Sequence, residues 1–131
     1  MATTTNIEKL YVTRNSSKIH QVCVENVPSG TAVAKAFFMV KEREWDADAS
    51  AVISKTIFPG QTVSGQIVDD GSANGTAILQ FIIDNDDANA LELSKLYIAA
   101  VKTILNNGMA YTPPYSRQPV RCLPAQIDAI S

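Results

Sequence analysis

The sequence contains few of the residues from which catalytic and metal sites are usually built. Its 131 residues include one histidine, two cysteines and one tryptophan, and only 18% are charged. No nucleophile-elbow, phosphate-loop or dinucleotide-binding motif occurs. His20 lies in an apolar, alternating segment with Val22 and Val24, which is typical of a structural histidine. We therefore expect no enzymatic activity, no catalytic residue and no cofactor.

The two cysteines, Cys23 and Cys122, lie near opposite ends of the chain and form no C-x-x-C pair. Because residues 1–6 lack the basic start and apolar run of a secretory signal, we expect synthesis in a reducing cytoplasm. Two free thiols buried in the core are then expected, and no disulfide.

Long apolar runs and basic clusters are also absent. No segment approaches the roughly 18 consecutive apolar residues of a membrane-spanning helix. The 11 basic residues are scattered and the formal net charge is −2, whereas nucleic-acid-binding domains gather basic residues on one surface. Neither a membrane nor a nucleic acid is expected as a partner.

Short apolar segments separated by turn signals recur along the chain. The clearest alternation places Ala36, Phe38 and Val40 on one side of a strand and Lys35 and Lys41 on the other. Turns at intervals of about eight to twelve residues are typical of a β-sandwich or barrel. The strands predicted in this part of the sequence cover residues 7–12, 19–24, 33–40, 51–57, 62–68 and 76–83.

Residues 87–108, DANALELSKLYIAAVKTILNNG, fit two structures. A helix over 88–105 would have apolar side chains nearly all round its axis, without the stripe of a surface helix. A strand over 96–105 places apolar residues on one face, and Asn106-Asn107-Gly108 then turns a hairpin. We favour the strand, with at most one helical turn between 84 and 93.

The C-terminal part is rich in proline, with four of the six prolines between 113 and 124. Because proline lacks an N–H donor, it is largely confined to edge strands and strand ends. We therefore expect an extended segment ending in an edge strand that contains Val120 and Cys122. The resulting organisation is an N-terminal arm (1–6), one domain (7–123) and a C-terminal arm (124–131).

The order of these segments resembles a known family. AKAFFMVKEREWDADASAVISKTI combines a strand, an acidic connection and a second strand, and KLYIAAVKTILNNGMAYTP combines a Lys-x-Tyr strand, an Asn-Gly turn and a return strand. This order is similar to that of the immunoglobulin-like N-terminal domain of baseplate upper proteins of tailed bacteriophages and of related phage tail proteins. The resemblance implies an all-β, immunoglobulin-like β-sandwich of seven to eight antiparallel strands.

The resemblance also implies a function. It suggests a non-enzymatic structural protein of a bacteriophage virion, most simply a tail or baseplate subunit. Such a subunit would link other virion proteins and copies of itself in a symmetric oligomer, through edge strands and terminal arms. A capsid decoration or cement protein remains open within the same class. In a different class, a soluble carbohydrate-binding or adhesin-type module remains open.

Aromatic and arginine side chains in loops are the candidates for an interface. Trp45 lies in a polar setting, so it either packs back on the rim of the sandwich or stands out as an anchor. The second group surrounds Pro113-Pro114 and the C-terminal arm, and ordinary loop packing is its alternative. The predicted interface residues are Trp45, Tyr111, Tyr115, Arg117, Arg121, Ile127 and Ile130.

The acidic segments 84–87 and 46–48 have the oxygen density that calcium sites need. Neither fits a calcium-loop pattern, because Ala88 falls at the fifth position of the frame that begins at Asp84, and Ala51 falls where the frame that begins at Asp46 needs its glycine. We therefore expect these carboxylates to cap turns, and no metal site.

Overall fold

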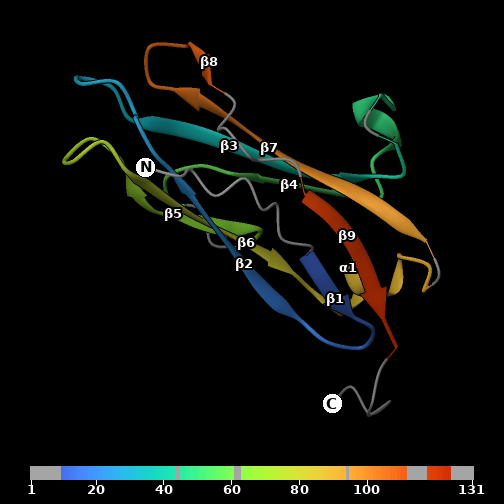
Figure 1. Ribbon diagram of the computed structural model, residues 1–131. Coiled ribbons are helices and arrows are strands. Elements are labelled where there is room, and N and C mark those ends of the chain that lie inside the picture. Colours follow the sequence, from blue (N-terminus) through green and yellow to red (C-terminus); the bar gives the residue numbers. More distant parts are fainter. Residues whose placement is uncertain (1–9, 44, 61–62, 94, 112–117, 125–131) are drawn as a thin grey trace, which may run out of the picture.

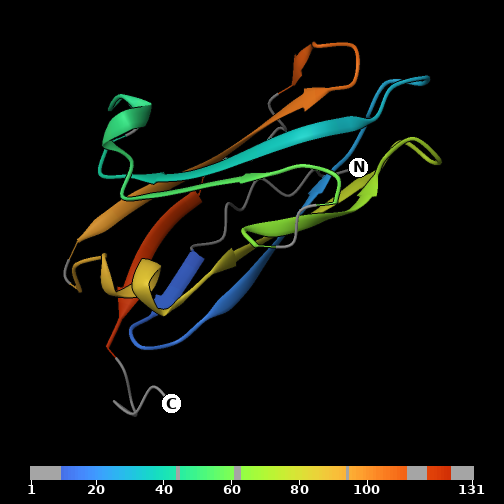
Figure 2. The same cartoon turned by 180° about the vertical axis from the view of Figure 1, so that it is seen from behind.

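In the computed structural model, which describes residues 10–43, 45–60, 63–93, 95–111 and 118–124, two β-sheets pack face to face (Figures 1 and 2). The described residues form nine strands and two short helical segments. In chain order the elements are β1 (Leu10–Thr13), β2 (Lys18–Val24), β3 (Val33–Lys41), η1 (Asp48–Ser50), β4 (Ile53–Ile57), β5 (Gly65–Asp70), β6 (Ala77–Ile83), α1 (Asn85–Asn89), β7 (Leu96–Leu105), β8 (Ala110–Tyr111) and β9 (Gln118–Leu123).

The strand order is that of an immunoglobulin-like sandwich. Sheet A has the order β1-β9-β7-β3-β4, with β8 also paired to β7, and sheet B has the order β2-β6-β5. Immunoglobulin domains place their second, fifth and fourth strands in one sheet and the third, sixth and seventh in the other. In this chain β4 is an additional strand at the edge of sheet A, beside β3, and β8 is a further short strand paired to β7, so the later strands carry higher numbers. The strands β2, β6 and β5 correspond to the first group, and β3, β7 and β9 correspond to the second. The predicted fold class is therefore confirmed, although β1 pairs with β9 in parallel rather than antiparallel.

A tyrosine near the start of β7 supports the same assignment. The backbone N–H of Glu92 donates to the hydroxyl oxygen of Tyr97 at 2.8 Å, and the Tyr97 ring is buried. Immunoglobulin-like domains use a tyrosine at this corner to bond the backbone a few residues upstream. The bond fixes the loop between α1 and β7 against the core.

The ambiguous stretch forms a strand, as predicted. β7 spans Leu96–Leu105 at the centre of sheet A, and α1 is a single helical turn before it. Tyr97, Ala99 and Val101 point into the sandwich, and the residues between them point outward. A strand buries one of these two apolar sets and leaves the other on the surface, whereas a helix would have to bury both. The predicted hairpin is also present, since Gly108 N–H donates to the Leu105 carbonyl at 2.8 Å.

The core lies between the sheets and centres on two phenylalanines. Phe38 of β3 and Phe81 of β6 are fully buried and stack with ring centroids 5.2 Å apart. Branched aliphatic side chains from both sheets surround them. At roughly 1.5–3 kcal/mol for each fully buried large side chain, this core provides most of the favourable folding energy.

The prediction of an edge position for the last strand is wrong. β9 lies inside sheet A, between β1 and β7. Pro119 is compatible with this position because it precedes the four residues that pair with β1, Val120 to Leu123. The missing N–H therefore falls at the start of the strand, where β1 does not need it.

Candidate interaction surfaces

The outer face of sheet A has a continuous apolar surface. Four adjacent strands contribute to it, because alternate residues of each strand point away from the sandwich. Tyr11 and Leu96 are 46% and 48% exposed, and the other members are exposed or half-buried. The apolar face of sheet A, as we define it, consists of Tyr11, Phe37, Met39, Leu96, Ile98, Ala100 and Pro119.

Strand register brings these side chains together. Ile98 lies opposite Pro119 of β9, and Met39 lies opposite Ala100 of β7. Directly opposite residues in a sheet have Cβ atoms about 5 Å apart. The apolar side chains therefore form one patch across the sheet rather than isolated contacts.

The charged side chains on the outward positions of sheet A are basic. Lys35, Lys102 and Arg121 face outward from β3, β7 and β9. Lys102 lies opposite Phe37, and Arg121 lies between Tyr11 and Leu96, so these two basic groups lie among the apolar side chains. Lys41 is also outward-facing, but its Nζ lies 2.7 Å from Oδ1 of Asp48. This hydrogen bond and ion pair lower the pKa of Asp48 below its usual value. The face therefore suits a partner that combines apolar side chains with acidic groups.

Trp45 stands out from the β3–β4 loop. It is 79% exposed, and the Arg43 guanidinium lies 5.9 Å from its ring centroid. Asp46 holds Arg43 by accepting from both its backbone N–H and its Nε, each at 3.1 Å. Of the two alternatives from sequence, packing back on the rim is wrong, and an exposed anchor remains the prediction.

The other described candidates differ in environment. Tyr111 of β8 donates its hydroxyl to the Glu25 carbonyl at 3.1 Å, and its ring packs against the core. It therefore helps to fix the β7–β8 hairpin to sheet B. Arg121 is half-buried between Tyr11 and Leu96, so its side chain lies among those of the apolar face of sheet A. The predicted interface residues Tyr115, Arg117, Ile127 and Ile130 lie outside the described residues.

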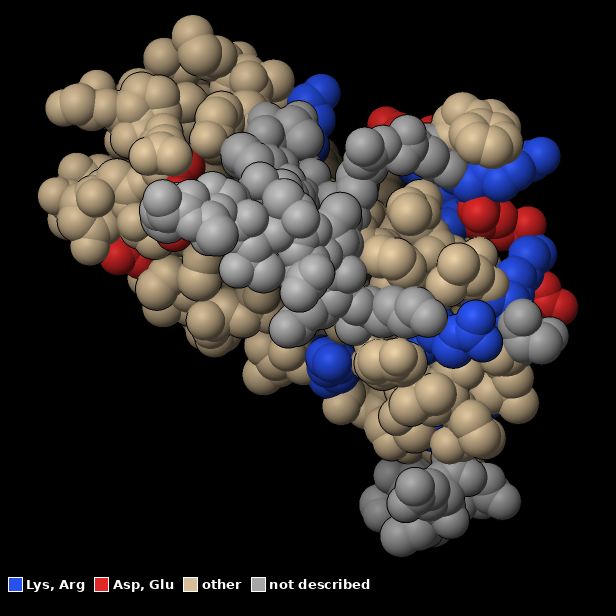
Figure 3. All heavy atoms as spheres, in the orientation of Figure 1, with Lys and Arg blue, Asp and Glu red and all other residues tan. Residues whose placement is uncertain are grey.

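Opposite charges gather at one end of the molecule. Figure 3 shows basic and acidic side chains together near η1 and the start of β7, with mostly uncharged surface beside them. Lys95 Nζ lies 2.7 Å from Oε1 of Glu42 and 3.3 Å from Oε2 of Glu92. Hydrogen bonds to these carboxylates raise the pKa of Lys95. Exposed pairs of this kind contribute little to stability.

The acidic segment 84–87 caps the short helix α1, whereas the sequence predicted an acidic turn next to a strand. Asp84 accepts from Asp87 N–H at 2.9 Å, and Asp87 accepts from Asp84 N–H at the same distance. These two bonds form a capping box. Asp87 Oδ2 also lies 2.7 Å from Nζ of Lys55, which points inward from the edge strand β4.

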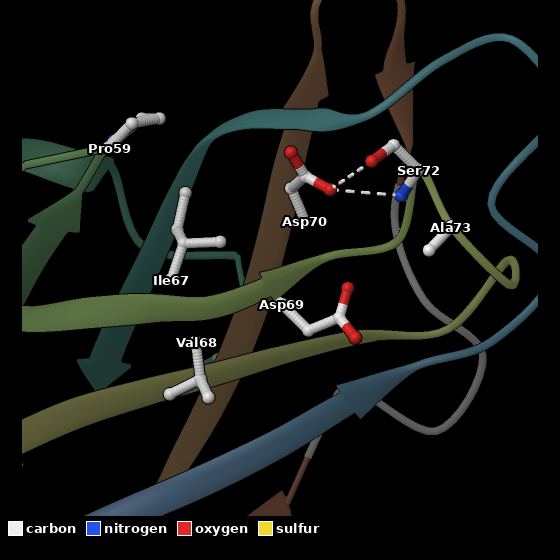
Figure 4. Close-up of a pocket in the computed structure, with 7 residues that line it drawn as sticks. All are labelled: Pro59, Ile67, Val68, Asp69, Asp70, Ser72 and Ala73. Carbon is white, nitrogen blue, oxygen red and sulfur yellow. Dashed lines mark hydrogen bonds between the residues drawn. The ribbon is translucent and has the colours of Figure 1, made fainter.

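A hollow of about 380 Å³ lies beside β5 and the following turn (Figure 4). Asp70 accepts from the N–H and hydroxyl of Ser72 at 2.9 and 2.7 Å, and Asp69 accepts from Gly71 N–H at 2.9 Å. The Ser72 bonds lower the pKa of Asp70. Both carboxylates therefore order the turn. The lining residues are Pro59, Ile67, Val68, Asp69, Asp70, Ser72 and Ala73.

His20 belongs to the core rather than to a surface site. Its ring lies 5.4 Å from that of Phe38, and 9% of the residue is exposed. Burial lowers the pKa of His20, repulsion from Lys18 adds to this, and the Gln118 side chain opposes it. The structural role expected from the alternation is confirmed.

The two cysteines are in different environments. Both are free, as predicted, and Cys122 is buried, which raises the pKa of its thiol. The prediction that Cys23 lies in the core is wrong. Cys23 points outward from β2, because the inward positions are those of His20, Val22 and Val24.

In the described part of the chain, no helix is long and apolar enough to span a bilayer. Within the same residues, no three His, Cys, Asp or Glu side chains are grouped closely enough to hold a metal ion.

Neither the protein-family models nor the curated proteins include a match to this chain. Similar folds occur among solved structures. One, from a photo-crosslinking study of cell-adhesive interactions of VGSC beta subunits, has 9% identity and a TM-score of 0.41, with 98% of this chain and 99% of that chain covered. The extracellular domain of the voltage-gated sodium channel beta4 subunit has 12% identity and a TM-score of 0.39, with 95% and 98% covered.

A third structure, the extracellular portion of mouse CD200RLa, has 9% identity and a TM-score of 0.33, with 89% of this chain and 55% of that chain covered. All three TM-scores are below 0.5. The fold assignment therefore rests on the strand order and the Tyr97 corner.

Proposed function

We propose that this protein is a non-enzymatic assembly domain that docks on another protein through the apolar face of sheet A. The observation that carries the proposal is the extension of that face over four strands, with basic side chains beside the apolar ones. Four strands about 4.8 Å apart and about seven residues long cover on the order of 500 Å². An interface of standard size buries about 800 Å² per partner, so the face can supply most of one.

Trp45 extends the same surface at its rim. Tryptophan and arginine are enriched among residues that dominate binding energy, and Arg43 and Trp45 are neighbours here. The basic groups Lys35, Lys102 and Arg121 favour acidic groups on the partner. The proposal assigns binding, not catalysis, because the single histidine is inside the core.

We further propose a bacteriophage virion as the setting, most simply the tail or baseplate. This part rests on the resemblance of the segment order to baseplate upper proteins. In such a particle the domain would link other virion proteins, and its localisation would be the virion. A capsid decoration protein would use the same face in the same way.

Mass spectrometry of purified particles tests both parts of the proposal. The chain should be present in tailed particles at a fixed stoichiometry, and its absence would overturn the virion setting. Met39→Lys places a charge within the apolar face, on β3, and should reduce incorporation at least tenfold, while circular dichroism stays unchanged.

The matched control is Ala73→Lys, at an exposed position in the β5–β6 turn. This variant adds the same charge away from the apolar face and should be incorporated normally. Equal incorporation of the Met39 and Ala73 variants would show that sheet A is not the docking surface.

A further inference from the structure

The outer face of sheet B is a second surface with an unusual composition. Ile19 and Val68 are 61% and 52% exposed, and Cys23 is also exposed. The charged member is Asp69, at the corner of the face, where it accepts from Gly71 N–H. The amide face of sheet B, as we define it, consists of Ile19, Gln21, Cys23, Gln66, Val68, Asp69, Ile78, Gln80 and Ile82.

Register arranges these side chains in three rows across the strands. Gln21, Gln80 and Gln66 form the middle row, one from each of β2, β6 and β5. Ile19 and Ile82 form the row on one side. Cys23, Ile78 and Asp69 form the row on the other side, with Val68 beside them in a bulge of β5.

The two hydrogen bonds along the glutamine row point the same way, from β5 toward β2. Gln80 Nε2 donates to Gln21 Oε1 at 3.2 Å, and Gln66 Nε2 donates to Gln80 Oε1 at 3.1 Å. Within the described part of the chain, the Gln21 amide nitrogen at one end and the Gln66 amide oxygen at the other have no partner in this ladder. Reversing all three amides would exchange donor and acceptor, but the two ends would stay complementary.

The occupant that matches this face is a second copy of the same face. A charged partner surface would lose hydration here without gaining an opposite charge, which is costly. A surface with isoleucines and a complementary amide row limits that cost to the Asp69 carboxylate, which already accepts a hydrogen bond from Gly71 N–H, and the chain itself supplies such a surface. The net charge of −2 gives little repulsion between copies.

We propose that two copies associate through the amide faces of their sheets B, about a two-fold axis parallel to β6. Face-to-face packing about this axis reverses the order of the strands in the second copy. Gln21 then lies opposite Gln66 of the second copy, so the donor end of one ladder meets the acceptor end of the other. Ile78 lies opposite Ile78 of the second copy, Ile82 lies opposite Ile82, and Cys23 lies opposite Asp69 of the second copy.

The size of the face makes the dimer weak. Three strands of about seven residues cover roughly 14 Å by 24 Å, well below the ~800 Å² per partner of a stable complex. The association is therefore concentration-dependent. The dimer interface lies on the opposite side of the sandwich from the apolar face of sheet A. The apolar face of sheet A therefore stays free in both copies. It does not depend on the function proposed above.

Sedimentation equilibrium on the whole chain tests this dimer. The wild-type mass should rise from 14.1 kDa toward twice that value as concentration increases to the millimolar range. Ile78→Lys and Ile78→Glu place like charges opposite each other, so each variant alone should stay monomeric. An equimolar mixture of the two should dimerise at lower concentration than the wild type, because lysine then faces glutamate.

A wild-type protein that stays at 14.1 kDa, an Ile78→Lys variant that dimerises normally, or a mixture that stays monomeric would each overturn the proposal. Met39→Lys should dimerise like the wild type, so loss of particle docking and loss of self-association can be told apart.

Cys23 provides a test without changing the face. Maleimide labelling of native protein should modify Cys23, while the buried Cys122 should not react. The fraction of Cys23 that is labelled in a fixed time at saturating reagent should fall as the protein dimerises. Labelling that is independent of protein concentration would overturn the proposal.

Discussion

His20 shows how one titratable side chain in the core connects stability to pH. Desolvation makes its charged form unfavourable in the folded state, so the pKa of His20 in the folded protein is below its ordinary value of 6.5. The unfolded state then binds a proton at a pH where the folded state does not. The stability that depends on a neutral His20 is complete above about pH 6.5. It is lost as the pH falls from 6.5 toward the lower pKa of His20 in the folded protein.

We therefore expect the free energy of unfolding to fall as the pH is lowered below about 6.5, by up to about 1.4 kcal/mol per pH unit. Urea unfolding at several pH values measures it. His20→Leu should remove most of this slope. Asp48, Asp70 and Asp84 also have lowered pKa values, but their ordinary value is 3.8, so their contributions are lost at lower pH. An unchanged slope in His20→Leu would contradict the assignment to His20.

Single residues also show where sequence-based inference fails. The alternation of His20, Val22 and Val24 predicts that Cys23 points outward, and it does. The prediction of a buried thiol followed the general tendency of cysteine to be buried rather than the period of the strand. Trp45 is different, because a loop has no period and its exposure depends on the Asp46 and Arg43 contacts.

At the scale of elements, strand identity was predictable and strand neighbours were not. β7 follows from the alternation of Tyr97, Ala99 and Val101, which is a local property. The interior position of β9 depends on pairing with β1, more than a hundred residues away in the chain. The alternation of side chains along a strand also does not say which of the two faces points into the core. This explains why the outward-facing Phe37 and Ile98 were not recognised as interface candidates.

The Tyr97 corner is an element-scale contact that can be measured. Tyr97→Phe removes the acceptor of Glu92 N–H, which is then left without its partner in the loop before β7. We expect a loss of about 1–3 kcal/mol in the free energy of unfolding, the usual cost of an unmade bond of this kind. Urea unfolding measures it. Tyr11→Phe is the matched control, because its exposed ring keeps its position and the change should be close to zero; equal losses in both would refute the role of the corner.

At the scale of the whole molecule, the two sheets expose different chemistry on opposite sides. Basic groups lie among the apolar side chains of sheet A, whereas the amide face of sheet B is almost neutral. A domain with two such faces can contact two neighbours at once, and paired copies would multiply weak contacts with a larger structure.

Self-association through sheet B also predicts a thermal signature, because any partner that binds only the folded state raises the melting temperature. Once the dimer predominates, a tenfold increase in concentration adds about 0.7 kcal/mol per chain, which raises the melting temperature by roughly 3 °C for a chain of this size. Calorimetry over a range of concentrations should show this rise for the wild type and for Met39→Lys, but not for Ile78→Lys. A melting temperature that rises equally in Ile78→Lys would place the contact between copies elsewhere, and a constant value in the wild type would mean that the folded chain does not self-associate.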